Sequence, residues 1–470
     1  MLQINHLSVT HIRDLRPIVT DFSLVLQPGE KAAVIGEEGN GKSTLLKLIY
    51  DDSLVAGYAE WTGQILRGQN RLGYLPQELT PEEQAQTVQA YWSCRSPLSA
   101  PEEAALLKQL DLPEALATWD RPLSRLSGGE RIKLQLARLL TAQPDILLLD
   151  EPSNDLDLTA LEFLEHFLST WPGAALFVSH DETLIRNTAN VIVHLEALRR
   201  KTAPRATVAR LPYDQYVEGR QAKFRHQAQV SRQEHAEFQK RMDRFLRIRN
   251  QVEHQQASIS RQDPHGGRLL KKKMHAIQSM GRRFEQEKAK LTQMPELEEA
   301  IFLRFPDSAK IPQGKRVLEF QLPRLEAGGR TLSRDIHLTI TGPERIGIIG
   351  PNGCGKTTLL RQIAQCFSER QDVTAAYMPQ NYGEVFDLSA TPVDFLNRSG
   401  SRAEATQIRN YLGSLRFTTQ EMEHPLAGLS GGQKAKVLFL QMILQGANVL
   451  ILDEPTRNFS PLSGPVIRSI

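Results

Sequence analysis

The chain has 470 residues, of which 40% are hydrophobic and 24% are charged. This length suffices for about three domains of ordinary size, and the composition is that of a folded chain. Three cysteines in no CxxC pattern argue against a disulfide framework, a zinc site or an iron–sulfur cluster. No apolar run approaches the roughly 18 to 20 residues that cross a bilayer, and the N-terminus has no signal-peptide pattern, so the sequence predicts a cytoplasmic protein.

The net charge of +3 is unevenly distributed along the chain. Residues 199–290 contain 23 Lys and Arg against 9 Asp and Glu, a net +14, so the flanking regions are net negative. A basic middle between acidic flanks is typical of a segment that binds a polyanion. A solvated helical spacer rich in Lys and Arg has the same composition, so charge alone leaves both interpretations open.

A glycine-rich segment, GEEGNGKST, follows an apolar strand predicted from Ala32 to Ile35 and precedes an apolar helix. Glycines allow backbone N–H groups to surround a phosphate, and the helix N-terminus adds its positive end. Lys42 would reach the outer phosphates and Ser43 would ligate magnesium. The predicted phosphate loop consists of Gly36, Gly39, Asn40, Gly41, Lys42, Ser43 and Thr44.

Two further motifs follow in chain order. YLPQ places Gln77 after a short strand, where its amide would bind the metal or a water. LSGGE then opens a helix with Ser127 as its predicted cap, and Gly128 and Gly129 leave backbone N–H groups exposed, which makes a second anion-binding surface.

The run Ile146 to Leu149 has the composition of a fully buried parallel strand, and it delivers two carboxylates at its carboxyl end. Asp150 suits a magnesium shell, and Glu151 would polarise an attacking water. LFVSHDE ends another strand with His180, whose imidazole would contact a terminal phosphate. A lone Gln or His after a strand is more often structural, so these roles depend on the neighbouring motifs.

The basic middle has the apolar spacing of two helices. Val217, Phe224, Phe238, Phe245 and Val252 fall on one heptad series, which polar Ser231 interrupts. A second series contains Leu270, Ile277, Phe284 and Leu291, and Pro264, Gly266 and Gly267 are expected to break the helix between them. We therefore predict a helical hairpin whose first arm of some 40 to 45 residues is about 60 to 67 Å long. Lys271 to Lys273 would lie near its tip.

The motifs of the first part recur after the hairpin as GPNGCGKTT, YMPQ, LSGGQ and VLILDEP, with equal spacing downstream of the YxPQ glutamines, so one domain is duplicated. A strand is expected at Ile346 to Ile349. The first copy has about eleven extra residues within Asp51 to Arg71, which are expected to form a surface loop. The second copy supplies Gly350, Asn352, Gly353, Gly355, Lys356, Thr357, Thr358, Gln380, Ser430, Gly431, Gly432, Asp453 and Glu454 in the roles of their first-copy counterparts.

These motifs in this order resemble the nucleotide-binding domain of ATP-binding cassette proteins over residues 1–198 and 301–470. Two cassettes joined by a basic linker, residues 199–300, resemble the ABC-F class. The resemblance implies an α/β fold with two P-loop cassette domains joined by a long helical hairpin. It also implies that the cassettes face head to tail around Mg²⁺ and two ATP molecules. One site would combine Lys42, Ser43, Gln77, Asp150, Glu151 and His180 with Ser430, Gly431 and Gly432, and the other Lys356, Thr357, Gln380, Asp453 and Glu454 with Ser127, Gly128 and Gly129.

The sequence departs from the family pattern in three places. Glu37 and Glu38 put negative side chains near the first phosphate site unless they point away. After Glu454, Asn458 and Ser460 stand where the first copy has acids. The counterpart of His180 would fall near position 483, so within the 470 residues the second cassette is incomplete at its C-terminus and lacks its switch histidine.

The resemblance implies an ATPase that acts in translation. In the ABC-F class the hairpin reaches the P-site tRNA and the peptidyl-transferase region of the ribosome, and some members protect the ribosome from antibiotics. For this chain it predicts a monomer that pairs its own cassettes and contacts ribosomal RNA mostly through shape and backbone phosphates. Two alternatives stay open: the ATPase subunit of a transporter, and an ATPase that binds DNA structures.

Overall fold

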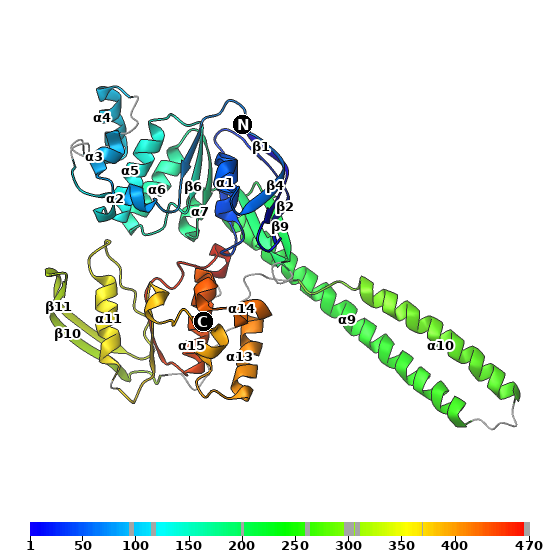
Figure 1. The fold of residues 1–470 in the computed structure, drawn as a ribbon. Coiled ribbons are helices and arrows are strands. Elements are labelled where there is room, and N and C mark those ends of the chain that lie inside the picture. The colour runs from blue at the N-terminus through cyan, green and yellow to red at the C-terminus, as the bar shows by residue number, and fades with distance from the viewer. Residues whose placement is uncertain are drawn as a thin grey trace. The chain divides into compact units, whose positions relative to one another are not determined.

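The computed structural model describes residues 1–93, 98–113, 119–198, 202–258, 264–295, 305, 311–368 and 370–464 (Figure 1). Its contacts divide the chain into two compact units. One unit contains Met1–Tyr213 together with Glu298–Ile470, and the other is Asp214–Leu297. Within the first unit we call residues 1–213 the first lobe and residues 311–464 the second lobe. The fold is mixed α/β with a long helical segment between the lobes in sequence, as predicted.

The first lobe contains two sheets whose buried apolar residues form one core with helix α1. Its strands are β1 (Leu2–His11), β2 (Pro17–Leu26), β3 (Lys31–Ile35), β4 (Ala59–Leu66), β5 (Leu72–Leu75), β6 (Ile146–Asp150), β7 (Ala174–Val178), β8 (Val191–Ala197) and β9 (Ala203–Ala209). Its α-helices are α1 (Lys42–Tyr50), α2 (Pro81–Ala85), α3 (Val88–Ser93), α4 (Ala100–Gln109), α5 (Gly128–Leu140), α6 (Leu158–Thr170) and α7 (Glu182–Thr188).

The larger sheet has the strand order β5-β6-β7-β3-β8-β9, and only β9 runs antiparallel to its neighbour. Every residue of β3, β6 and β7 is buried, because helices and the second sheet cover both faces of a parallel sheet. The carboxyl ends of parallel strands share one edge. This edge therefore carries the phosphate loop after β3, the carboxylates after β6 and His180 after β7.

Two segments near the first lobe differ from the expectations. The eleven extra residues do not form a loop, because Ala59–Leu66 is strand β4 and pairs antiparallel with β1. Only Ala59 is buried, so this edge strand is made by backbone hydrogen bonds and has no apolar alternation to reveal it. The segment that was expected to begin the linker at residue 199 contains strand β9. This strand pairs with β8 in the larger sheet of the first lobe.

The second lobe repeats part of this architecture. A hairpin of β10 (Arg316–Ala327) and β11 (Arg330–Thr341) accompanies the parallel pair β12 (Ala375–Met378) and β13 (Val449–Leu452). The helices are α11 (Lys356–Cys366), α12 (Pro392–Leu396), α13 (Arg402–Ser414), α14 (Thr419–Glu423) and α15 (Gly431–Leu444).

The strand expected at Ile346 to Ile349 is not formed, and the side chain of Ile349 is 90% exposed. The reason lies in the strand order. In the first lobe β3 is held between β7 and β8, both of which follow Glu151, and it does not touch β6. No described strand of the second lobe occupies the place of β7 or β8, so the segment 346–349 has no strand beside it among the described residues.

The second unit is the predicted hairpin. Helix α9 (Tyr213–Ser258) has 46 residues, which corresponds to about 69 Å, and α10 is Pro264–Lys290. Phe238, Phe245, Val252 and Ile277 are buried between the helices, and Phe284 contacts both Phe238 and Phe245.

Polar Ser231 occupies a fully buried position of the predicted heptad series and donates to the carbonyl of Thr292 at 2.8 Å. The predicted break between the helices falls earlier than expected, because α10 begins at Pro264 and includes both glycines. Proline fits the first turn of a helix, where its missing N–H is not needed. The side chain of Leu270, which belongs to the second predicted series, lies outside the described residues.

Candidate nucleotide-binding sites

The first phosphate loop joins β3 to α1. Gly41 precedes the helix with φ at 83°, a conformation that favours glycine, and a Cβ there would lie 2.0 Å from Ile18 Cγ2. Lys42 Nζ donates to the carbonyls of Gly36 at 3.0 Å and Glu37 at 3.1 Å. Burial lowers the pKa of Lys42, and the neighbouring carboxylates of Glu151 and Glu37 oppose this effect. The buried side chain of Lys42 therefore lies against the loop that was predicted to hold a phosphate.

The second phosphate loop repeats this geometry. Gly355 precedes α11 with φ at 101°, and Lys356 Nζ donates to the carbonyls of Gly350 at 2.8 Å and Pro351 at 3.0 Å. The equivalent lysines of the two copies thus make equivalent contacts with their loops.

Two of the residues predicted to hold magnesium, Ser43 and Asp150, contact each other in the first lobe. Ser43 Oγ donates to Asp150 Oδ1 at 2.9 Å, and burial raises the pKa of Asp150 to about 6 although this hydrogen bond opposes the rise. In the second lobe Asp453 Oδ2 is buried and has no hydrogen-bond partner among the described residues. Mg²⁺ in phosphate sites binds one or two carboxylates and keeps its other positions for phosphates and water. An Asp with a neighbouring hydroxyl fits that donor set, although within the described ranges no group of three or more Asp, Glu, His or Cys residues is arranged to hold a metal ion by itself.

Glu151 follows strand β6 with φ at 51°, and its counterpart Glu454 has φ at 49°. Both carboxylate oxygens of Glu151 are engaged: Oε1 lies 3.0 Å from His180 Nε2, and Oε2 accepts from Asn154 Nδ2 at 2.7 Å. Burial by itself would raise the pKa of Glu151, but the hydrogen bond and charge of His180, with the charge of Lys42, lower it to about 2. The side chain is therefore charged, and both of its oxygens have fixed neighbours.

Glu454 has different neighbours. Its Oε2 accepts from Gln380 Nε2 at 3.0 Å and lies 3.7 Å from Arg457 Nη1. Arg457 occupies the place of Asn154 in the duplicated motif, so a guanidinium stands where the first lobe has an amide. The two predicted catalytic carboxylates therefore differ in their local charge.

Each LSGG motif begins a helix as predicted. Ser127 Oγ accepts from Glu130 N at 3.2 Å, and Ser430 Oγ accepts from Gln433 N at 3.3 Å. In both cases the side chain of the donating residue in turn accepts from the backbone N–H of the serine. These capping boxes fix the start of each helix and leave the glycine N–H groups for other acceptors.

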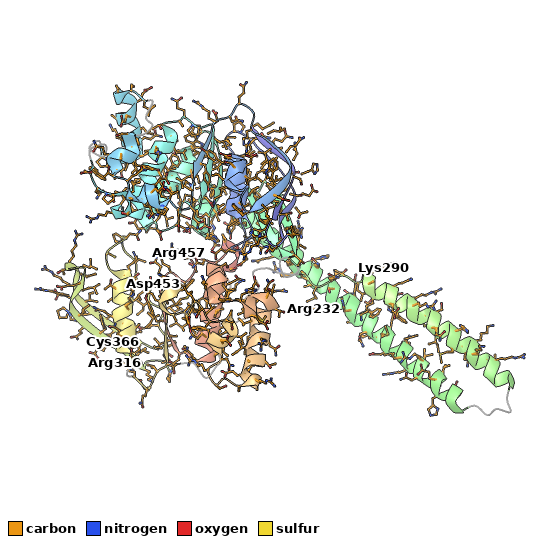
Figure 2. The ribbon with its side chains drawn as sticks, in the orientation of Figure 1. Arg232, Lys290, Arg316, Cys366, Asp453 and Arg457 are labelled. Atoms are coloured by element: carbon orange, nitrogen blue, oxygen red, sulfur yellow. The ribbon has the colours of Figure 1, made fainter. Side chains whose placement is uncertain are left out.

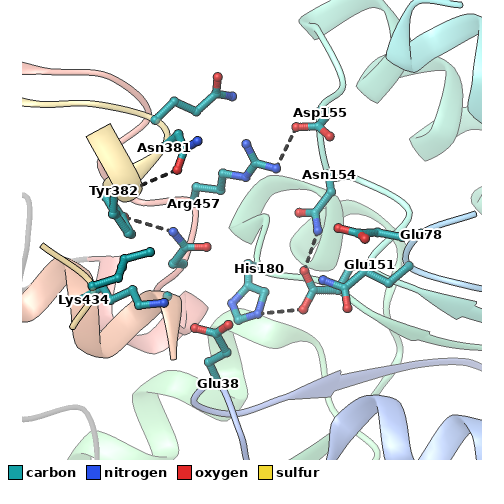
Figure 3. A pocket seen from close by; sticks show the side chains of 16 residues that line it. Glu38, Glu78, Glu151, Asn154, Asp155, His180, Asn381, Tyr382, Lys434 and Arg457 are labelled. Atoms are coloured by element: carbon teal, nitrogen blue, oxygen red, sulfur yellow. Dashed lines mark hydrogen bonds and ion pairs between the residues drawn. The ribbon is translucent and has the colours of Figure 1, made fainter. Parts of the chain in front are cut away.

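Loops from the two lobes contact each other directly (Figure 3). His180 Nδ1 lies 2.8 Å from the carbonyl of Phe459, and Arg457 Nη2 lies 2.7 Å from Asp155 Oδ1. Asn352 Nδ2 donates to the carbonyl of Asp155 at 2.6 Å. The loops after the two predicted catalytic carboxylates therefore pair a basic side chain of the second lobe with an acidic one of the first.

Glu37 and Glu38 of the first phosphate loop point to the second lobe. Glu38 Oε2 accepts from the backbone N–H of Gly432 at 2.6 Å. Glu37 is buried, with Oε1 accepting from Ser463 Oγ at 3.0 Å and Oε2 lying 3.5 Å from Lys436 Nζ. The acids that the sequence placed near a phosphate are thus engaged by the second lobe.

The phosphate loops and LSGG helices meet in crossed pairs. A Cβ on Gly431 would lie 3.1 Å from Glu38 Oε2, and a Cβ on Gly128 would lie 3.6 Å from Asn352 Nδ2. Each phosphate loop therefore lies against the signature glycines of the other lobe.

Comparison with known proteins identifies the family. A family model described as "ABC transporter" matches residues 19–154 and 333–457. The ribosome protection protein VmlR of Bacillus subtilis is 32% identical, over 92% of this chain and 75% of its own. The ATP-binding protein Uup of Escherichia coli is 29% identical, over 94% and 72%, and mouse ATP-binding cassette sub-family F member 3 is 30% identical, over 72% and 45%. The chain is an ABC-F protein.

As an ABC-F protein it has two cassettes and is an ATPase. A pocket of this ABC-F protein contains residues from both lobes (Figure 3). Gln77, Glu151 and His180 line it from the first lobe, and Gln380 and Arg457 line it from the second. The pocket thus collects several residues that were predicted separately from distant parts of the sequence. No helix within the described ranges has the length and hydropathy needed to traverse a membrane.

The sequence prediction missed three participants at this junction. Asn154 and Arg457 contact the predicted catalytic carboxylates, and each stands three residues after its glutamate, so aligning the two copies would have drawn attention to them. Lys436 lies inside a helix, and nothing in the local sequence distinguishes it from a solvated lysine. Lys436 is 7% exposed, and its ammonium lies 3.5 Å from Glu37 of the opposing lobe.

Proposed function

We propose that this ABC-F protein is a ribosome-associated ATPase that acts in the cytoplasm as a monomer. Its hairpin would contact ribosomal RNA near the P-site tRNA and the peptidyl-transferase region, and so protect the ribosome from antibiotics or modulate translation. The observation that carries the proposal is a hairpin that is closed on its apolar side and basic on its exposed side. The similarity to VmlR, whose name states ribosome protection, supports the choice of partner.

The hairpin offers many positive charges to a partner. Phe238 and Phe245 of α9 each contact Phe284 of α10, so these large apolar side chains are used between its own helices. Arg232 and Lys290 are exposed on its two helices (Figure 2). Other exposed basic side chains are Lys223, Arg225, Lys240, Arg244, Arg247, Lys271, Lys272, Lys273, Arg282, Arg283 and Lys288. Such a surface binds phosphates rather than base edges, as expected for recognition of folded RNA by shape.

We assign two ATP sites to the crossed pairs of loops and helices. The first would use Lys42, Ser43, Gln77, Asp150, Glu151 and His180 with Ser430 to Gly432. The second would use Lys356, Thr357, Gln380, Asp453 and Glu454 with Ser127 to Gly129. Mg²⁺ bound at the Asp and hydroxyl pairs would neutralise phosphate charge. ATP that contacts both lobes favours their paired form, so binding shifts the population toward a ribosome-binding conformation.

The test is sedimentation of a Glu151→Gln, Glu454→Gln double variant with ribosomes. These substitutions keep the side-chain size and remove the bases, so ATP should hold the variant in its paired form. We expect it to pellet with ribosomes in ATP but not in ADP, and less at high salt because phosphate contacts release counterions. The unsubstituted chain, which turns ATP over, should pellet less in ATP.

Three outcomes would contradict the proposal. Pelleting only with membrane vesicles would favour the ATPase subunit of a transporter. Binding to duplex DNA without ribosome binding would favour a DNA-structure ATPase. Equal pelleting in ATP and ADP would show that the lobes do not control the hairpin.

A further inference from the structure

We propose that Glu38 is an internal competitor for the terminal phosphate of ATP at the first site, and that it lowers the preference of this site for ATP over ADP. The inference rests on the assignment of that site under the proposed function. It concerns a feature of this chain that its second site lacks.

The first step is the hydrogen bond that Glu38 makes. The first N–H groups of a helix have no partner within the helix, and they carry its positive end. In α15 the N–H of Gln433 is capped by Ser430, whereas that of Gly432 is donated to Glu38 Oε2 at 2.6 Å. A carboxylate therefore holds one of the donors that the LSGG motif was predicted to present to a phosphate.

The second step is the anchor beside it. Glu37 is 8% exposed and receives Ser463 Oγ and Lys436 Nζ from the second lobe. Lys436 lies on α15, the same helix whose N-terminus binds Glu38. A buried ion pair thus fixes the phosphate loop against this helix and keeps the neighbouring carboxylate at Gly432.

The third step is the contrast with the second site. There Pro351 and Asn352 occupy the places of Glu37 and Glu38. Asn352 donates to the carbonyl of Asp155 at 2.6 Å and brings no negative charge to the N-terminus of α5. Among the described residues, the first assigned site therefore has a carboxylate of the opposing phosphate loop bound at its signature helix, and the second does not.

The consequence is a selective effect on ATP. Glu38 must release Gly432 before that N–H can bind the terminal phosphate, and ADP makes no such demand. Glu38→Asn, which installs the residue of the second loop, should raise ATP affinity at the first site about tenfold, or about 1.4 kcal/mol. ADP affinity should stay within about twofold.

The experiment measures ATP and ADP binding by titration with fluorescent analogues in a Lys356→Ala background, which disables the second site. Glu78→Gln is the matched control, because it removes the same charge from a second glutamate that lines the same pocket. A rise in ATP affinity for Glu38→Asn but not for Glu78→Gln supports the inference. Equal rises in both variants, or an equal rise in ADP affinity, would mean that Glu38 acts only by general charge repulsion, and this would overturn the inference.

A second measurement needs no nucleotide. Hydrogen exchange of the peptide containing residues 430–433 should be faster in Glu38→Asn than in the parent chain, since the Gly432 amide loses its acceptor. Unchanged exchange would overturn the contact itself. Lys42→Ala separates the two proposals. If this variant still binds ATP, the site assignment fails. If it does not bind ATP and Glu38→Asn has the ATP affinity of the parent chain, only this inference fails.

Discussion

At the scale of single residues, His180 connects the chemistry of one lobe to the backbone of the other. One ring nitrogen lies 3.0 Å from Glu151 and the other lies 2.8 Å from the carbonyl of Phe459. Because the imidazole is held from both sides, the orientation of the Glu151 carboxylate depends on the contact between the lobes. A chemical step that requires this orientation is therefore available only when the loops meet.

His180→Ala removes both contacts. We expect single-turnover ATP hydrolysis at the first site to fall about 100-fold, the usual scale for losing a residue that positions acid–base chemistry. The measurement uses the Lys356→Ala background, and ATP binding there should change little. His166→Ala, an exposed histidine on α6, is the matched control and should leave the rate unaltered. An undiminished rate in His180→Ala would assign the ring a purely structural role.

At the scale of elements, the hairpin is a compact unit with its own apolar seam. Phe245 is 7% exposed and its ring lies 5.2 Å from that of Phe284, so these two residues join α9 to α10. The polar Ser231 and Thr292 hydrogen bond closes the seam where the apolar series is interrupted. The arms are thus held together without help from a partner.

Phe245→Ala should lower the free energy of hairpin opening by about 3 kcal/mol, since it removes a large buried side chain and leaves a cavity. Hydrogen exchange of the α9 and α10 amides measures this directly. Ile248→Ala on the same helix, where the side chain is 46% exposed, should change it by less than about 0.5 kcal/mol. Similar losses in the two variants would mean that the seam does not hold the arms.

At the scale of the whole molecule, positive charge is concentrated in one unit and nucleotide chemistry in the other. Replacing Lys271, Lys272 and Lys273 together by Gln should weaken ribosome binding and reduce the slope of log affinity against log salt by up to about 3. ATP binding should be unchanged.

The matched control for this triple variant removes three exposed basic residues of the lobes, Lys108, Arg125 and Arg402. It has the same change in net charge and should retain the parent affinity and salt slope. If both variants lose affinity equally, net charge rather than the hairpin attracts the ribosome. A parallel loss of ATP binding in the lysine variant would indicate a folding defect instead.

Much of the molecule follows from short stretches of sequence. Three features depend on neighbours within a few residues: the loop from Gly36 to Thr44, the Ser127 cap and the buried strand before Asp150. Their local sequence therefore determines their geometry. The heptad series likewise placed Phe245 and Ile277 in the seam of the hairpin. Duplication then extended each motif to the second lobe.

Other features were decided only by tertiary contacts. Ile346 to Ile349 is apolar like β3, but no strand lies beside it within the described ranges, whereas Ala59–Leu66 is a strand because β1 offers it a free edge. Glu37 and Lys436 are 399 positions apart, and their pairing depends on how the lobes meet. Backbone preferences and apolar periodicity act over a few residues and can be recognised locally, whereas hydrogen-bond partners, burial and charge pairing exist only after distant segments have packed together.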